Sequence, residues 1–275
     1  MVPDVLIEKL FSIMNNMKLT LIMLLFLTSF TQGKQKLRIG LDWVINIQHG
    51  VLIYAKTKNL IPKNTEFVPF QNSSKALQQL SLGTIDLAIS YEPAIIALQK
   101  KGLNIQASYT LIAEPLDVFV STIPLKDLKG RKIGHQSSPG SFSENFLADI
   151  LQTVSLTFRD VQLVYSLYHL SQGLLSGQYD AAMHIPLIFA PELLEHNPNL
   201  KIYKLEAFGI YYNGQVVAQH VNCENMDGIY QGLKKAKEEI AVNPENAWRI
   251  IIKEYPEFNT IKTKERWFRY IALIS

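Results

Sequence analysis

Short apolar runs typical of β-strands alternate along this chain with runs typical of amphipathic helices, and this alternation constrains the fold more than any other feature. Strand-like runs occur at 37–42, 65–70, 86–90, 105–113, 116–121, 131–135, 161–166, 180–184, 201–207 and 215–220. Helix-like runs lie between them at about 49–58, 73–82, 93–101, 142–153, 170–176 and 190–196, and Pro256 breaks a helical tail that begins near 226. The alternation predicts α/β sheets covered by helices and argues against an all-α or all-β fold.

The N-terminal segment has the pattern of a secretory signal peptide. A basic start at Met17 precedes a mostly apolar run over 19–30, and small residues at 31–33 provide a cleavage site. This run is shorter than the about 20 apolar residues that a membrane-spanning helix needs. Acidic residues upstream of Met17 are unusual in a signal peptide, so we expect translation to begin at Met17. The pattern predicts removal of 1–33 and export to the periplasm.

Composition narrows the possible functions. The formal net charge of +3 is small and dispersed, so no nucleic-acid partner is predicted. With 48% hydrophobic and 19% charged residues, the chain can bury a substantial core. Cys223 is the only cysteine, which excludes an intramolecular disulfide and an iron–sulfur cluster and predicts a buried, small hydrophobic side chain. The histidines lack metal-ligand spacing, so we predict neither a metal nor a cofactor.

Two extended segments suit crossovers between two lobes. The first covers 117–124 and the second 203–209. They predict one lobe from 34–121 together with 205–275, and a second lobe from 122–204. A chain that crosses twice forms a hinge.

Five motifs follow one another in a characteristic order. They are Leu41-Asp42-Trp43 with a following Asn46 and His49-Gly50, GTIDLAISYEP at 83–93, TLIAEPL at 110–116, KDLKGRKIG at 126–134 and LLSGQYDA at 174–181. In these motifs the chain resembles periplasmic solute-binding proteins of the thiamine-pyrimidine-precursor (ThiY-like) type, and the resemblance covers nearly the whole mature chain.

The resemblance implies a two-lobed type II periplasmic binding protein fold with a hinge of two crossovers. It also implies that the protein delivers a thiamine pyrimidine precursor, such as a formylaminopyrimidine or hydroxymethylpyrimidine, to an ABC permease of the inner membrane. Such a protein is not an enzyme and needs no cofactor. Ligands of open α/β sheets lie outside the carboxyl ends of strands, which is where the motif residues stand.

Two aromatic residues follow predicted strands and could stack on a flat heterocycle. Trp43 follows the first strand and Tyr91 follows the run at 86–90. An aminopyrimidine needs an aromatic face and a few polar groups that bind its edges. The alternative for each residue is packing in the core, and the resemblance favours the ligand role.

Polar residues beside these aromatics are further candidates for ligand contact. Asn46 and His49 offer an amide and an imidazole in the first loop, although His49 could equally cap the helix that it begins. Glu92 precedes Pro93, a residue suited to the first turn of a helix. Its carboxylate could accept a hydrogen bond from a ligand amino group or only stabilise the helix dipole.

A polar loop at 136–141 joins a predicted strand to a predicted helix. Ser141 and Glu144 have the spacing of a capping box. Free N–H groups at a helix start can hold a carbonyl or an anionic group. The resemblance implies that this loop lines the site, and the candidates are Ser137, Ser138, Gly140 and Ser141.

The second lobe departs from the resembled family. Where the family has a Gly and an Asn-Phe-Glu, this chain has His184 and the sequence Ile188-Phe189-Ala190. These changes leave the fold expectation intact and leave the ligand open. His184 either replaces the missing polar group or has a structural role.

Two other functions remain as alternatives. A thiamine pyrimidine synthase of the same fold would use a Lys and a His near 89–94, where this chain has ISYEPA, and a Cys-rich iron-binding motif that it lacks. A binding protein for a sulfonate or another small anion would favour Arg near the ligand, and few Arg residues lie near the predicted site. Nucleophile and phosphate-loop motifs are absent from the sequence.

Overall fold

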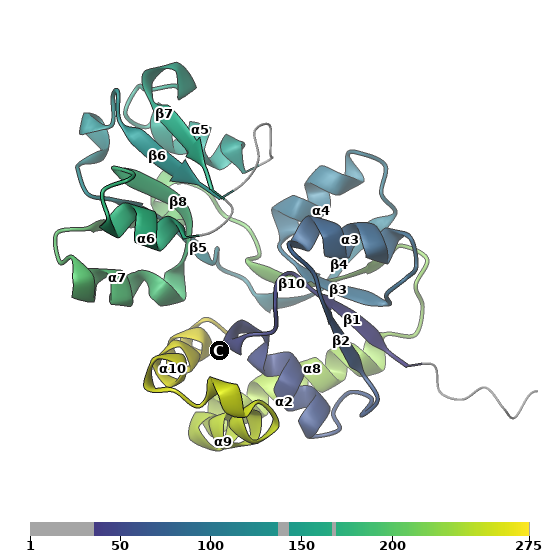
Figure 1. Cartoon of the computed structure of the whole chain (residues 1–275). Coiled ribbons are helices and arrows are strands. Elements are labelled where there is room, and N and C mark those ends of the chain that lie inside the picture. The colour runs from purple at the N-terminus through teal and green to yellow at the C-terminus, as the bar shows by residue number, and fades with distance from the viewer. Residues whose placement is uncertain (1–35, 137–142, 167–168, 275) are drawn as a thin grey trace, which may run out of the picture. The chain divides into compact units, whose positions relative to one another are not determined.

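Two mixed five-stranded sheets form the framework of the molecule (Figure 1). The computed structural model describes residues 36–136, 143–166 and 169–274. The chain divides into the units Met1–Lys36 and Leu37–Ser275, and the architecture described below is that of the second unit. The predicted signal peptide lies outside the described residues and stays a prediction.

The first sheet combines strands from both ends of the chain. Its order is β2-β1-β3-β10-β4. The strands are β1 (Arg38–Leu41), β2 (Glu66–Pro69), β3 (Leu87–Ser90), β4 (Ile105–Ile112) and β10 (Gln215–His220). β1 runs parallel to β2 and β3, whereas β10 is antiparallel to both of its neighbours, β3 and β4. The strand that comes last in the sequence, β10, therefore lies inside the sheet, between β3 and β4.

Helices cover both faces of this sheet (Figure 1). α3 (Ser73–Ser81) and α4 (Glu92–Gln99) pack on one face, and α2 (Gly50–Thr57) and α8 (Asp227–Val242) belong to the core on the other. The Asn72 side chain caps α3 by accepting a hydrogen bond from Lys75 N at 3.0 Å. The local signals for these helices thus agree with the burial of their apolar sides.

The second sheet is built from one continuous stretch of sequence. Its order is β7-β6-β8-β5-β9. The strands are β5 (Asp117–Ser121), β6 (Lys132–His135), β7 (Gln162–Tyr165), β8 (Ala181–Pro186) and β9 (Lys201–Lys204). One face packs against α5 (Glu144–Gln152), and the other against α6 (Leu170–Leu175) and α7 (Ala190–His196).

The sheet pairing differs from the lobe division drawn on the sequence. β5 pairs with β8 and β9, whereas a boundary after 121 groups it with the first lobe. Beyond β9, Leu205 and Ile210 pack in a core cluster with residues of the second sheet. The exact lobe boundaries stay a prediction, and by pairing and packing the second group of elements extends from β5 to about residue 212.

The segments that lead into β5 and β10 are held to their surroundings by short-range contacts. A Cβ on Gly214 would stand 2.0 Å from the Glu114 backbone oxygen, so only glycine allows the segment before β10 to approach the segment before β5 so closely. Asn213 donates from its backbone N and its Nδ2 to Glu92 Oε2, each at 3.0 Å. Glu92 thereby anchors the segment before β10 to the start of α4.

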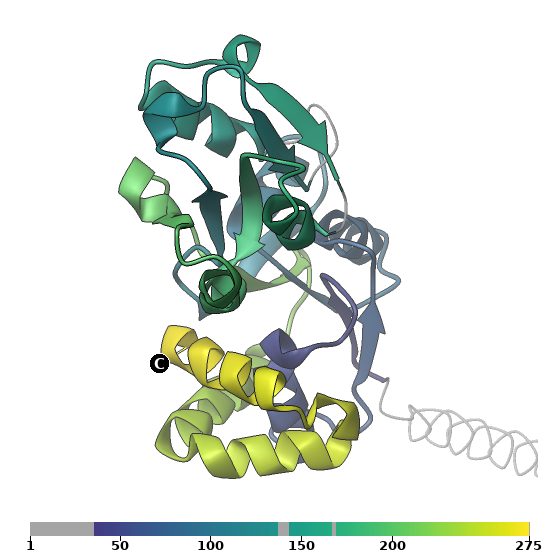
Figure 2. The same cartoon turned by 60° about the vertical axis from the view of Figure 1, so that its left-hand side comes forward.

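Three helices end the described chain, and each of them contacts the other two (Figure 2). α8 ends at Val242, α9 spans Pro244–Glu254 and α10 spans Ile261–Ile274. The break at Pro256 is confirmed, because α9 ends shortly before it. The Asn243-Pro244 break was not predicted. None of the helices among the described residues combines the length and the apolar character needed to cross a membrane.

α10 carries a charged contact to α7, a helix of the second group. Arg266 donates from Nε and Nη2 to the two oxygens of Glu192, each at 2.7 Å. Arg269 donates to the Ile188 backbone oxygen at 3.0 Å and also pairs with Glu192 at 3.4 Å. The Arg266 guanidinium lies 4.2 Å from the centre of the Phe189 ring. We call Glu192, Arg266 and Arg269 the α7–α10 clamp.

Candidate functional site

The loop after β1 is organised by its own polar side chains. Asn46 caps the 3₁₀ helix η1 (Ile47–His49) by accepting from Gln48 N at 2.8 Å. The Asn46 backbone N donates to His49 Nδ1 at 3.2 Å. Nδ1 is then the acceptor of a neutral ring and Nε2 carries the proton, which it donates to Asp42 Oδ1 at 2.9 Å. His49 is buried, and its ring connects the Asn46 backbone to the Asp42 carboxylate at the tip of β1.

The aromatic candidates of the first sheet are partly buried. Trp43 is the second residue after β1, and Tyr91 precedes α4 and packs against the core beneath α3. Burial raises the pKa of the Tyr91 hydroxyl to about 12; a hydrogen bond with Ser73 opposes the rise, and the charges of Asp117 and Asp42 add to it. Tyr91 therefore remains a neutral phenol at physiological pH.

In the second sheet, a histidine and an aspartate from two neighbouring strands meet at one end of those strands. His184 lies near the carboxyl end of β8, and Asp117 is the first residue of the antiparallel β5. His184 Nδ1 and Asp117 Oδ2 are 3.0 Å apart, and the side chains are 11% and 26% exposed. His135 ends the neighbouring strand β6, and its ring meets that of His184 edge to face with centres 5.0 Å apart.

Electrostatics connects these groups to the aromatic residues. Burial raises the pKa of Tyr212, and the nearby Asp117, Tyr91 and Glu206 raise it further. The Tyr212 ring stacks on Phe146 with centres 5.3 Å apart. The charge of Asp117 raises the pKa of both Tyr91 and Tyr212, so the aspartate acts electrostatically on both phenols. We call the following residues the strand-end cluster: Asp42, Tyr91, Asp117, His135, His184 and Tyr212.

The structure gives the sequence candidates different surroundings. Tyr91 and His184 belong to the strand-end cluster, and Asn46 and His49 support it through Asp42. Glu92 is engaged with Asn213, as described above. Ser137, Ser138, Gly140 and Ser141 lie outside the described residues. Direct ligand contact by any of these candidates, and by Trp43, stays a prediction.

Sequence reasoning missed three members of the cluster, Asp117, His135 and Tyr212. Asp117 and His135 share one signal, since each is a polar residue at the end of an otherwise buried strand. The sequence runs are Asp117-Val-Phe-Val-Ser121 and Lys132-Ile-Gly-His135. No local signal shows that these two ends meet across β8. Tyr212 follows a turn and has no comparable signal.

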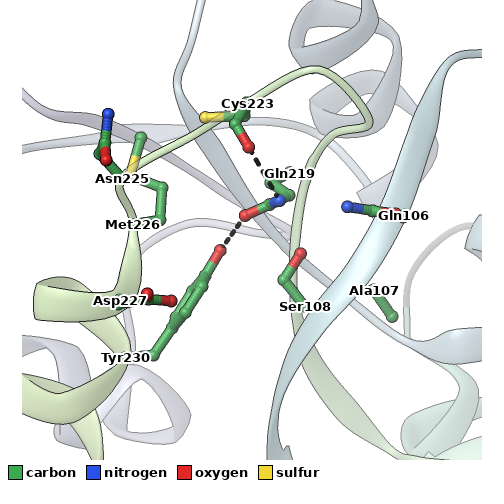
Figure 3. A pocket seen from close by; sticks show the side chains of 9 residues that line it. All are labelled: Gln106, Ala107, Ser108, Gln219, Cys223, Asn225, Met226, Asp227 and Tyr230. Atoms are coloured by element: carbon green, nitrogen blue, oxygen red, sulfur yellow. Dashed lines mark hydrogen bonds between the residues drawn. The ribbon is translucent and has the colours of Figure 1, made fainter.

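A polar pocket of about 340 Å³ lies at the opposite end of the first sheet (Figure 3). Tyr230 donates its hydroxyl hydrogen to Gln219 Oε1, and Gln219 Nε2 donates to the Cys223 backbone oxygen at 3.3 Å. Gln219 pairs with Leu87, the first residue of β3, so the pocket lies at the amino ends of the parallel strands. Cys223 is partly exposed in this pocket, so the expectation of a buried thiol is wrong. The reason is that Cys223 lies in a loop that packs only partly against the sheet.

The chemistry available at the strand-end cluster is hydrogen bonding and stacking. Within the described ranges, no group of three or more His, Cys, Asp or Glu residues is arranged to hold a metal ion. The cluster combines two carboxylates, two imidazoles and two neutral phenols. Such a set can bind a small, flat molecule that presents N–H donors along its edges.

Comparison with known proteins places this geometry in a family context. Residues 46–247 match the family described as NMT1/THI5 like. A Haemophilus influenzae protein named for thiamine biosynthesis is 28% identical over 90% of this chain and 82% of its own length. A formylaminopyrimidine-binding protein of Halalkalibacterium halodurans is 21% identical over 83% and 73%, respectively. A 4-amino-5-hydroxymethyl-2-methylpyrimidine phosphate synthase of Saccharomyces cerevisiae is 21% identical over 87% and 77%.

Solved structures show the same fold. The periplasmic aliphatic sulphonate binding protein of Escherichia coli superposes with a TM-score of 0.66 at 20% identity, covering 86% of this chain and 84% of the other. The alkanesulfonate-binding protein of Xanthomonas axonopodis pv. citri gives 0.61 at 19% identity, covering 86% and 83%. The periplasmic binding protein fold expected from the sequence is confirmed.

Proposed function

We propose a function on the premise that this chain belongs to the NMT1/THI5-like family. In this proposal the protein is the solute-binding component of an ABC importer and binds an amino-substituted pyrimidine precursor of thiamine. It performs no covalent chemistry. Ligand binding favours one conformation of the molecule, and the permease recognises that conformation.

The strand-end cluster is the observation that carries the proposal. Apart from Tyr212, its residues stand at or next to strand ends of the two sheets, where open α/β folds bind ligands. The phenols of Tyr91 and Tyr212 offer aromatic surface, and the carboxylates and imidazoles offer acceptors to amino groups. The relative that is named for binding a formylaminopyrimidine supports this class of ligand.

The synthase alternative lacks its reagents at the matching positions. Yeast relatives are named as pyrimidine phosphate synthases, and the resembled synthase family uses a Lys and a His after the third strand. Here Tyr91, Glu92 and Pro93 occupy those positions, and Glu92 anchors Asn213 instead. We therefore favour binding over synthesis.

The sulfonate alternative conflicts with the charge of the cluster. Two structural neighbours are named as sulfonate binders, and a sulfonate is an anion that needs cationic partners. The cluster instead contains the carboxylates of Asp42 and Asp117, which would repel it. A neutral or weakly basic ring avoids that repulsion.

A thermal-shift and calorimetry experiment on the purified full chain tests the proposal. We expect 4-amino-5-hydroxymethyl-2-methylpyrimidine to raise the Tm, since a ligand at 100 times its Kd stabilises the native state by about 2.7 kcal/mol. An alkanesulfonate should leave the Tm unchanged, and pyridoxal phosphate should give no Schiff-base absorbance. A Tm increase with the sulfonate alone would reject the proposed ligand class.

An aromatic substitution locates the binding site in the same assay. Trp43→Ala should weaken pyrimidine binding by about 0.5–1.5 kcal/mol beyond the loss of buried area, the range for aromatic pairs. Phe158→Ala is the control, because Phe158 is an exposed aromatic on η3 (Phe158–Asp160) before the amino end of β7. Unchanged affinity in a folded Trp43→Ala protein would assign Trp43 to packing.

A further inference from the structure

A β-bulge forces His184 out of the regular pattern of β8. Val118 pairs with Ile185 and Val120 pairs with Ala182. Phe119 on β5 is therefore opposed by two residues on β8, Met183 and His184. Bulges of this kind redirect a side chain and occur often beside functional sites.

The packing on the two faces of β8 identifies His184 as the extra residue. Met183 packs with Ala181 in the cluster on one face. Ile185 packs with Ala182 in the cluster on the other face. Strict alternation would have put Ile185 beside Met183. Because of the bulge, Ile185 faces the same side as Ala182. His184 is the extra residue and belongs to neither apolar cluster.

The backbone of His184 is also in an unfavourable conformation. Its φ is +67°, in the left-handed region, which costs a residue with a side chain about 1–2 kcal/mol. Strained residues of this kind cluster at binding and catalytic sites. Here the unusual backbone directs the imidazole toward Asp117.

The contact with Asp117 determines which ring nitrogen of His184 is a donor. A carboxylate only accepts hydrogen bonds, so the Nδ1 atom at 3.0 Å from Asp117 Oδ2 carries the proton. In the neutral ring Nε2 is then an acceptor. This Nε2 is buried, and none of the described residues gives it a hydrogen-bond partner. Leaving such an atom unsatisfied costs about 1–3 kcal/mol.

We propose that His184 is the specificity-determining residue of the site: its Nε2, held as an acceptor by Asp117, accepts a hydrogen bond from a neutral N–H group of the ligand. The inference rests on the proposed function and specifies the chemistry of the ligand edge. A ligand with an amino group satisfies the buried acceptor, whereas a ligand with only oxygen acceptors at that position leaves two lone pairs facing each other. Asp117 acts as a positioning residue, because it sets the tautomer.

Binding of two matched pyrimidines tests the inference. The probes are 4-amino-5-hydroxymethyl-2-methylpyrimidine and its 4-methoxy counterpart, which has no N–H at that position. The wild-type protein should bind the amino compound at least about tenfold more tightly, as loss of a buried hydrogen bond requires. In His184→Asn the ratio should fall toward one. Asn tolerates the left-handed backbone, but its amide is too short to replace Nε2.

Two further variants complete the experiment. Asp117→Asn removes the charge that selects the tautomer, so the ratio should fall there as well. His220→Asn is the control, because the His220 ring accepts from Asn222 N at the far end of β10; this variant should keep the wild-type ratio. A ratio that is unchanged in His184→Asn, or near one in the wild type, overturns the inference while pyrimidine binding stands. If neither pyrimidine binds, the proposed function fails together with it.

The tautomer can be measured without any ligand. Nitrogen-15 NMR of the full chain should show His184 neutral with the proton on Nδ1 and a bare Nε2. A proton on Nε2 in the neutral ring would overturn the inference independently of the binding data.

Discussion

Among single residues, Gly50 shows most directly how packing limits the sequence. A Cβ at this position would stand 2.4 Å from Cζ3 of Trp267, and the Trp267 side chain is fully buried. The start of α2 can therefore approach α10 only because residue 50 has no side chain. This contact also fixes the position of the preceding His49, which holds Asp42.

The Gly50→Ala substitution should destabilise the protein by about 1–3 kcal/mol, the usual cost of overpacking a core. Gly228→Ala is the matched control, since Gly228 lies in α8 and a Cβ added there would have no atom within 4 Å. In a helix, alanine is favoured over glycine by about 1 kcal/mol, so the control should be neutral or stabilising. Urea unfolding measures both. Equal effects would show that the contact with Trp267 relaxes at no cost.

For single residues, the sequence shows which side chains are candidates for the site better than it shows which residues they contact. Trp43, Tyr91 and His184 could be selected because each stands beside a predicted strand end. The partner of His184 could not, because Asp117 is 67 positions away and meets it only through the antiparallel pairing of β5 with β8. The bulge is equally hidden, since it appears only when two strands are aligned.

Among the secondary-structure elements, α10 has the widest reach. Trp267 and Tyr270 bury it in the core of the first sheet, and the α7–α10 clamp joins it to a helix of the second. The Arg266 hydrogen bonds are the largest influence that lowers the pKa of Glu192; desolvation opposes it, and the charges of Arg266, Arg269 and Lys262 add to it. The carboxylate is thus more stable in the folded protein than in the unfolded chain.

The sign of this shift gives a pH-dependent prediction. A carboxyl group with a lowered folded pKa stabilises the protein above its ordinary pKa, and the contribution is lost as the pH falls through the folded value. Glu192→Gln should therefore reduce the free energy of unfolding at pH 7 by about 1.5–3 kcal/mol, as for hydrogen bonds to charged groups. The difference from wild type should shrink as the pH falls below the ordinary pKa of a glutamate.

The control for the clamp is an exposed ion pair that joins α10 to α9. Lys264 and Glu245 are 2.8 Å apart and 41% and 43% exposed. Exposed pairs contribute about 0–1 kcal/mol, so Glu245→Gln should change the unfolding curve little at any pH. A loss in Glu192→Gln that does not depend on pH would show that packing, and not charge, holds α7 to α10.

The elements themselves were largely predictable because their signals are local. Each strand-like run matches an observed strand to within a few residues, and the Pro256 break was visible in the sequence. The Asn243-Pro244 break was missed because the apolar pattern continues across it. Helix α9 there uses Asn243 as its cap, with the side chain accepting from Asn246 N at 3.0 Å.

For the whole molecule, the predicted export can be checked by its product. If 17–33 is a signal peptide, the protein recovered from its native host should begin near residue 34, because signal peptidase removes the segment during translocation. N-terminal sequencing of the periplasmic fraction measures this. A protein that retains the run at 19–30 and is found in the cytoplasm would contradict the periplasmic proposal.

The central place of β10 also dictates the order in which the two sheets can be completed as the chain is released from its N-terminus. All strands of the second sheet, β5 to β9, are available for pairing once the chain has been released as far as residue 204. The first sheet begins earlier but must wait, since β3 and β4 share no pairing and each borders the strand that arrives last. Until then both present open edges, which are prone to pairing with other chains. The part of the protein translated first is thus the part that finishes folding last.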